Sequence, residues 1–338
     1  MPIRLAILGL DPIQRDWLEA VRLLRTNNEI EPVAAGHHAL APARALADLL
    51  EIPAYDDLRM LLKETTPHIL LLDRPDNASL DFLAGCLDQD IGLFSLGPIV
   101  QSYGEARRLA ELLEPRTRLL YSWPHFADSF AWKHCASADE FIRPIRFASM
   151  TWLGLNHALA KSSDRTESAV RSMSVLAWDA LATLISLIDV PTSVYAAIRG
   201  SAATGATDSF ADITGSAALT LRFPDDVTAS VTLSDRLPAR RELLVMGQNG
   251  ALRLDGERYS FGDGDGKIID EGVSSREPGI DHAAAALRRF IEQFTAQPSP
   301  TRGWDHRLEE IASTMEAMLV SHRTGSAESP EKFRTLRR

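Results

Sequence analysis

The first residues that could bind a ligand lie in the stretch LAILGLDPIQRDW (residues 5–17). Here an apolar run ends at Gly9 and a helical pattern follows. A strand, a glycine turn and a helix N-terminus together offer free backbone amides to the pyrophosphate of a dinucleotide. Only the first glycine of a G-x-G-x-x-G fingerprint is present here, because the corresponding stretch reads Gly9, Leu10, Asp11, Pro12, Ile13 and Gln14. Asp11 adds a negative charge where phosphate oxygens would lie, and Pro12 removes an amide donor. Both residues therefore oppose dinucleotide binding at this turn.

The same residues also have the pattern of a helix cap. Aspartate is a preferred N-cap residue, proline is favoured at the first helical position, and Gln14 stands where it can complete a capping box. In this interpretation the carboxylate of Asp11 accepts hydrogen bonds from the amides that a pyrophosphate would have used, which stabilises the helix by about 1 kcal/mol. We favour this interpretation over a working phosphate loop.

The second apolar run, EPVAAG, is followed by His37 and His38. A dinucleotide site has a carboxylate at this strand end, where it binds the ribose hydroxyls. A protonated imidazole would instead attract a 2′-phosphate. The alternative, which we favour, is that the two histidines only open a polar loop.

The secondary structure that must position these residues is predicted to differ between the two halves of the chain. The first 122 residues alternate short apolar runs with helical patterns, which predicts an α/β domain with a parallel sheet covered by helices. After about residue 140, segments such as GSAALTLRF and VTASVTL alternate apolar and polar residues between turn signals, which predicts an α+β domain with a large, mostly antiparallel open sheet. We therefore expect a Rossmann-like domain over 1–122, with the helices of 280–323 able to pack back on it. A second, α+β domain over 123–323 and a solvated tail over 324–338 would complete the chain.

The composition excludes several classes of partner. A formal net charge of −10 leaves no basic surface for nucleic acid or an anionic membrane. The first apolar run is too short for a secretion signal or a membrane span, so we expect a cytoplasmic protein. Cys86 and Cys135 have no metal-ligand spacing, which predicts two buried thiols, no disulfide and no metal site.

The order of the motifs resembles that of the glucose-fructose oxidoreductase, inositol dehydrogenase and rhizopine-catabolism (Gfo/Idh/MocA) family over nearly the whole chain. The matching segments are YDDLRMLL, the strand HILLLD followed by Pro75, the strand IGLFSL followed by Pro98, the helix EARRLAELL, and RLEEIASTMEAMLVSHRTGS near the end. The resemblance implies an NAD(P)-dependent oxidoreductase of sugars or polyols that associates with copies of itself through its large sheet. It places the cofactor contacts at Gly9, Asp11, Pro75 and Pro98.

The sequence departs from the family at the positions that carry its chemistry. The family's Glu-Lys-Pro, whose lysine binds the reacting hydroxyl, is replaced by Leu96, Gly97 and Pro98. Its aspartate and histidine at the start of the long second-domain helix correspond to Ser172 and Leu176, and only the later aspartate, Asp179, remains. Alcohol oxidation needs a base within hydrogen-bond reach of the hydroxyl, and glycine, leucine and serine cannot supply one alone. Lys161 is the best candidate for a shifted replacement, and Asp179 is either functional or structural.

A ligand site, if kept, should lie at the carboxyl ends of the parallel strands, between the domains. The residues expected near it are Trp123, His125, Trp152, Asn156, His157, Trp178 and Asp179. Tryptophan faces with a few polar groups suit a sugar-like ligand, whereas the alternative is that these are core tryptophans and structural histidines. His125 and His157 are candidates for an acid–base pair of a different reaction, such as elimination or epimerisation.

Two functions follow from these observations. The first is a family-like protein that no longer transfers hydride and binds a sugar-like ligand or a protein partner. The second is an active NAD(P)-dependent sugar or polyol oxidoreductase with rearranged cofactor and catalytic contacts.

Overall fold

The computed structural model describes residues 1–10, 15–73, 78–113, 119–122, 142–154, 173–200, 210, 213–238, 240–255, 258–273, 279–296 and 307–335. The chain divides into two compact units. The first contains Met1–Trp123 and Glu277–Leu308, and the second contains Pro124–Arg276 and Glu309–Arg338.

The first unit is built on a six-stranded sheet in which all neighbouring strands are parallel, as the alternating pattern predicts. The strand order is β3-β2-β1-β4-β5-β6. The strands are β1 (Ile3–Leu8), β2 (Ile30–Gly36), β3 (Ala54–Tyr55), β4 (Ile69–Leu72), β5 (Gly92–Ser95) and β6 (Leu120–Ser122). The helices are α1 (Arg15–Thr26), α2 (Leu40–Leu50), α3 (Leu58–Thr65), α4 (Leu80–Asp88), α5 (Tyr103–Leu113) and α8 (Gly279–Thr295).

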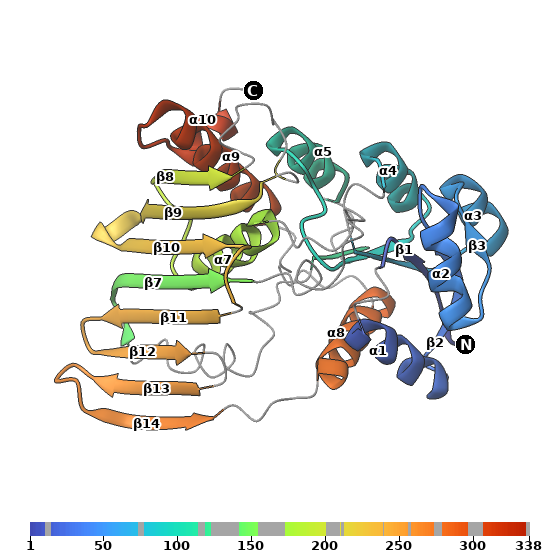
Figure 1. The fold of residues 1–338 in the computed structure, drawn as a ribbon, viewed down its shortest axis with the longest axis horizontal. Helices are drawn as coiled ribbons and strands as arrows, with labels where there is room; N and C mark the ends of the chain where they lie inside the picture. Colours follow the sequence, from blue (N-terminus) through green and yellow to red (C-terminus); the bar gives the residue numbers. More distant parts are fainter. Residues whose placement is uncertain are drawn as a thin grey trace. The chain divides into compact units, whose positions relative to one another are not determined.

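The core of this unit lies where α1 and α8 pack on the sheet (Figure 1). The side chains of Trp17, Val21 and Leu24 form the buried stripe of α1 that their spacing predicts. The ring of Trp17 meets Phe94 of β5 edge-on, with centroids 5.5 Å apart, and Phe94 stacks on Tyr121 at 4.9 Å. This aromatic layer ties α1 to β5 and β6, the last two strands at one edge of the sheet.

The second unit is built on an eight-stranded sheet in the order β14-β13-β12-β11-β7-β10-β9-β8 (Figure 1). Only β7 and β10 are parallel neighbours, so the sheet is mostly antiparallel, as predicted. The strands are β7 (Ile145–Leu153), β8 (Ser193–Gly200), β9 (Gly215–Arg222), β10 (Thr228–Ser234), β11 (Arg240–Gly247), β12 (Gly250–Asp255), β13 (Arg258–Asp263) and β14 (Ile268–Val273). The helix α7 (Met173–Leu187) packs on β7 and β10.

The closing helices belong to different units. The helix α8 packs against α1 in the first unit, whereas α9 (Leu308–Thr324) lies against β8 in the second, where Ser321 Oγ accepts a hydrogen bond from Ala196 N at 3.0 Å. Residues 324–335, the described part of the segment predicted to be a solvated tail, are folded. Glu328 pairs with Val194 of β8 through two backbone hydrogen bonds, and α10 (Pro330–Thr335) follows.

The described part of the chain holds no helix that is both long and apolar enough to cross a lipid bilayer. Cys86 is buried in α4 as a free thiol, in agreement with the sequence, and Cys135 lies outside the described residues.

Candidate functional site

The turn after β1 keeps the glycine that the sequence identifies. Gly9 has a φ of 69°, a conformation that glycine adopts without strain, and its N–H donates to the carbonyl of Gly36 at 3.0 Å. Leu10 next to it is buried in the core of the first unit. Asp11, Pro12 and Gln14 lie outside the described residues, so the capping interpretation stays a prediction.

The end of β2 has no carboxylate. A Cβ atom on Gly36 would lie 2.5 Å from Leu8 Cδ2 and 2.7 Å from Leu61 Cδ1, so buried leucine methyl groups fill the space that a side chain would need. His37 Nδ1 accepts a hydrogen bond from Ala39 N at 3.0 Å, just before α2. The rings of His37 and His38 lie 4.0 Å apart. At these positions the residues do not fit the acidic contact that the family resemblance implies for the ribose hydroxyls.

Two hydrogen bonds hold the segment at the end of β5 in place. The N–H of Leu96 donates to the carbonyl of Leu72 at 2.7 Å, and Ser95 Oγ donates to the carbonyl of Gly97 at 2.8 Å. Leu96, Gly97 and Pro98 are all buried. The position at which the resemblance expects a lysine therefore has no side chain, and Pro75, after the neighbouring strand, lies outside the described residues.

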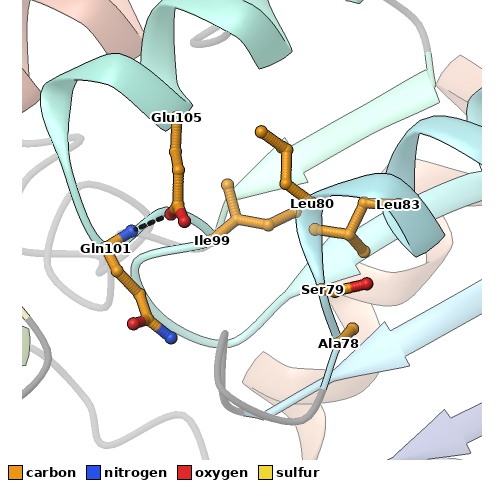
Figure 2. Close-up of a pocket in the computed structure, with 7 residues that line it drawn as sticks. All are labelled: Ala78, Ser79, Leu80, Leu83, Ile99, Gln101 and Glu105. Carbon is orange, nitrogen blue, oxygen red and sulfur yellow. Dashed lines mark hydrogen bonds between the residues drawn. The ribbon is translucent and has the colours of Figure 1, made fainter.

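A small cavity of about 160 Å³ lies between the N-terminal ends of α4 and α5 (Figure 2). Its polar groups hold the two helix ends in place. Glu105 Oε2 accepts from Gln101 N at 2.7 Å, and Ser79 Oγ accepts from Phe82 N at 3.2 Å. The wall combines these polar groups and the Gln101 side chain with the side chains of Ala78, Leu80, Leu83 and Ile99. The cavity is smaller than the roughly 300 Å³ at which ligand pockets usually begin. The lining residues are Ala78, Ser79, Leu80, Leu83, Ile99, Gln101 and Glu105.

In the second unit, the structure brings together two of the residues expected near a ligand. Trp152 of β7 donates from Nε1 to Asp179 Oδ2 of α7 at 2.9 Å, and both side chains are buried. Arg241 of β11 lies with Nη2 3.7 Å from the same oxygen. Trp178 and Leu176 of α7 are buried as well. Asp179 is therefore held by an indole N–H and a guanidinium, which neutralises a carboxylate that is costly to bury unpaired.

The other expected site residues are not described. Trp123, His125, Asn156, His157, Lys161 and Ser172 lie outside the described residues, so the distance between His125 and His157 and any role of Lys161 stay predictions.

Sequence reasoning missed Asp235, a buried carboxylate directly after β10. Its Oδ1 accepts from Gly215 N at 2.9 Å and its Oδ2 accepts from Met173 N at 3.3 Å, so it joins the start of β9 to the first turn of α7. Burial raises the pKa of this carboxyl, and the two backbone hydrogen bonds partly oppose the rise. A lone aspartate after an alternating strand gives no signal of this role in the sequence.

No group of three His, Cys, Asp or Glu side chains able to hold a metal ion occurs among the described residues.

Comparison with known proteins finds similarity in structure rather than in sequence. No protein-family model matches the chain, and no curated protein matches it either. Among solved structures, myo-inositol 2-dehydrogenase from Lactobacillus plantarum is 15% identical, with a TM-score of 0.75 over 97% of this chain and 99% of that one. An oxidoreductase from Thermotoga maritima is 15% identical, with a TM-score of 0.78 over 98% of this chain and 100% of that one.

A third similar structure holds ligands. Levoglucosan dehydrogenase in complex with NADH and levoglucosan is 11% identical, with a TM-score of 0.76 over 97% of this chain and 99% of that one. The resemblance in motif order and the similarity in structure agree over nearly the full length. The chain thus has the two-domain fold of the Gfo/Idh/MocA-type NAD-binding oxidoreductases.

Proposed function

We propose that this chain keeps the oxidoreductase fold without the hydride-transfer reaction, and that it binds a sugar-like ligand or a protein partner. One observation carries the proposal. Asp179, the remaining acid of the family constellation, is buried and accepts a hydrogen bond from Trp152 Nε1. A carboxylate bonded in this way joins α7 to β7 and so has a structural role.

The chemistry of alcohol oxidation supports the same conclusion. A base must come within about 3 Å of the substrate hydroxyl and titrate near the working pH. Gly97 offers no side chain, and Leu176 is buried and apolar. Neither residue can remove a proton from a hydroxyl, so these two family positions supply no base.

The expected cofactor contacts also argue for this function. A dinucleotide needs amides for its pyrophosphate and a hydrogen-bond acceptor for its adenosine ribose. A side chain at Gly36 would have to displace the methyl groups of Leu8 and Leu61, and the Nδ1 of His37 is already bonded to Ala39 N. The sequence adds Asp11 and Pro12 at the pyrophosphate position.

The class of ligand is proposed from the similar structures. One is a myo-inositol dehydrogenase and another binds levoglucosan, so both act on polyhydroxylated rings. A net charge of −10 is compatible with a neutral ligand of this kind and disfavours a polyanion.

The alternative is an active NAD(P)-dependent sugar or polyol oxidoreductase with rearranged contacts. The φ of 69° at Gly9 favours it, because the backbone turn that lets a pyrophosphate approach is kept. Lys161 or the pair His125 and His157 would then have to replace the missing base.

Calorimetric titration separates the two functions. We expect no heat of binding from NAD⁺, NADH, NADP⁺ or NADPH, and binding of levoglucosan or myo-inositol if the ligand is sugar-like. Micromolar affinity for any of the four dinucleotides would overturn the first proposal in favour of the alternative.

A gain-of-function variant tests the same point. The triple variant Gly97→Lys, Ser172→Asp and Leu176→His restores the family residues, and we expect it to show no turnover with NAD⁺ because Asp11 and Pro12 remain. Its fold would be checked by circular dichroism, since Leu176 is buried. Turnover by this variant would show that Asp11 does not block the cofactor.

We also propose that the chain self-associates through its eight-stranded sheet, as the family resemblance implies. Light scattering during size-exclusion chromatography gives the mass directly, and a mass near the 37.2 kDa of one chain at every concentration would overturn this part.

A further inference from the structure

Arg241 stands at the start of β11, on the face of the eight-stranded sheet on which α7 packs. Side chains alternate along a strand, so Arg241 shares this face with the buried Leu243 and Val245. Its direct neighbour across the ladder is Trp152 of β7, whose indole N–H donates to Asp179 of α7. Arg241 therefore lies beside the buried carboxylate, at the end of the sheet where β7 ends and β11 begins.

The guanidinium of Arg241 is held by one long ion pair. Its Nη2 lies 3.7 Å from Asp179 Oδ2, which is beyond hydrogen-bond distance, and no hydrogen bond of the Arg241 side chain occurs among the described residues. The Arg241 side chain is 30% exposed, whereas that of Asp179 is 4% exposed. The guanidinium therefore balances a buried charge and keeps N–H donors that solvent or a ligand can reach.

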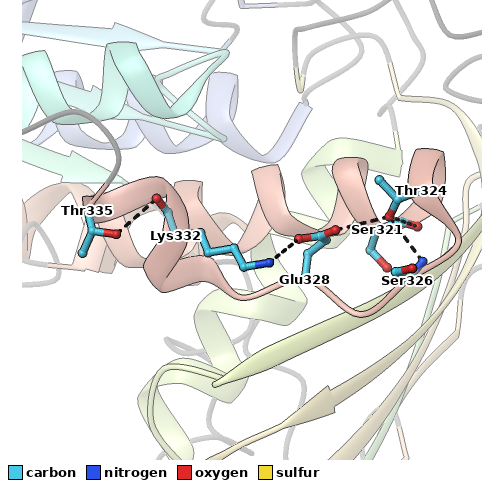
Figure 3. Close-up of polar contacts among 6 residues, drawn as sticks. All are labelled: Ser321, Thr324, Ser326, Glu328, Lys332 and Thr335. Carbon is cyan, nitrogen blue, oxygen red and sulfur yellow. Dashed lines mark hydrogen bonds and ion pairs between the residues drawn. The ribbon is translucent and has the colours of Figure 1, made fainter.

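Two charged side chains elsewhere in the second unit are hydrogen-bonded within the protein. Arg240 precedes Arg241 on β11, points to the opposite face of the sheet and donates to Glu242. Glu328 accepts from Lys332 Nζ at 3.2 Å (Figure 3). A ligand would have to break such bonds to use these groups, whereas at Arg241 it would only replace water.

The shape of the guanidinium and the charge beside it indicate the class of ligand. A guanidinium presents its N–H donors in a planar fork, which can bond to two neighbouring oxygen atoms at once. The positive charge of Arg241 is already balanced by Asp179, so a carboxylate or phosphate on the ligand would add a second negative charge near the buried one. Neighbouring hydroxyl oxygens of a neutral ring accept the same two bonds without that repulsion.

We infer that Arg241 binds a neutral polyhydroxylated ring by donating from its guanidinium to two neighbouring hydroxyl oxygens, at the end of the sheet beside Asp179. This inference rests on the proposed binding of a sugar-like ligand and names the residue that selects it. Arg241 then has two separable roles, because its charge stabilises the fold next to Asp179 and its fork binds the ligand.

Lysine and glutamine substitutions separate these roles. Arg241→Lys keeps the positive charge but loses the fork. Its free energy of unfolding in urea should stay near that of the wild type, while its dissociation constant for levoglucosan or myo-inositol, measured by calorimetry, should rise at least tenfold. Arg241→Gln should weaken binding as well, and it should also lower the free energy of unfolding because Asp179 loses its opposing charge.

Arg240→Lys is the matched control, because it makes the same change at the adjacent residue on the opposite face of the sheet. It should bind both rings as the wild type does. A charged probe tests the ligand class, since D-glucuronate adds a carboxylate to a similar ring. The wild type should bind D-glucuronate more weakly than the neutral rings, and tighter binding of D-glucuronate that Arg241→Gln abolishes would overturn the neutral class.

The remaining outcomes distinguish this inference from the function on which it rests. A wild type that binds neither levoglucosan nor myo-inositol would overturn the proposed sugar binding and, with it, the role of Arg241. Wild-type affinity in both Arg241 variants would overturn only the role of Arg241. Affinity that Arg241→Lys keeps and Arg241→Gln loses would overturn the paired contact to two hydroxyl oxygens, because a single charge would then be enough.

Discussion

Trp152 and Asp179 are joined by a buried hydrogen bond of 2.9 Å that links β7 to α7 across 27 positions in the sequence. The carboxylate of Asp179 was a candidate for catalysis, and its bond to an indole N–H fixes it within the second unit. Removing the donor should leave a buried charge with one fewer partner.

Trp152→Phe should accordingly lower the free energy of unfolding by about 2 kcal/mol beyond the loss caused by the smaller ring. Trp178→Phe is the control, since it removes a similar volume from buried α7 without removing the donor to Asp179. Urea unfolding of both variants measures the difference. Equal losses in the two variants would mean that the hydrogen bond contributes nothing measurable.

The raised pKa of Asp235 predicts a pH dependence. Burial is the largest cause of the rise, so the folded state holds this proton more tightly than the unfolded chain, whose aspartates titrate near pH 3.9. Stability contributed by Asp235 should therefore increase as the pH falls from above the folded pKa towards about 4. The free energy of unfolding of the wild type minus that of Asp235→Asn, measured in urea across this range, should grow on acidification. A flat difference would refute the assignment.

The ion pair between Glu29 and Arg288 predicts the opposite trend. Arg288 Nε and Nη2 each lie 2.7 Å from a Glu29 carboxylate oxygen, and this hydrogen bonding is the main cause that lowers the pKa of Glu29. The contribution to stability should be complete above the unfolded value near pH 4.3 and lost as the pH falls through the lower folded pKa. Because both side chains are about a third exposed, Glu29→Gln should cost only about 1 kcal/mol at neutral pH. Glu31→Gln, a change at an exposed glutamate two residues further along, in β2, is the control for chemical denaturation. An equal effect in both variants would contradict the prediction.

Cys86 should be inert in the native protein. Burial raises the pKa of its thiol to about 12, so almost no thiolate exists at pH 8. In a Cys135→Ser background, iodoacetamide should label Cys86 only after unfolding in urea, as followed by mass spectrometry. Labelling of the native variant at the rate of the unfolded one would show that the α4 core opens.

The fold could be predicted because its signals are local. The apolar runs that became β1, β4 and β5 are buried on both faces, which is typical of a parallel sheet, and the spacing of Trp17, Val21 and Leu24 marks the buried side of α1. The folding of residues 326–335 could not be predicted, because their polar composition resembles that of a tail. What holds them is a pairing with Val194, more than a hundred positions away.

The candidate site shows the same limit. The absence of a lysine at Gly97 and of a carboxylate after β2 is visible in the sequence. The bonds of Asp179 to Trp152 and of Asp235 to Gly215 and Met173 depend on side chains that only the tertiary structure brings together. From residue types alone, Asp179 is therefore either functional or structural, and nothing distinguishes Asp235 from other aspartates.

Gly36 sets a practical rule for redesign. Leucine methyl groups occupy the place of its missing side chain, so an engineered ribose contact at the end of β2 cannot be grafted there without repacking the core. His37 is the better position, because an aspartate substituted for it has an oxygen that can replace Nδ1 as the acceptor for Ala39 N and keep the start of α2 unchanged. Redesign of this chain to bind a dinucleotide would therefore start with the substitution His37→Asp.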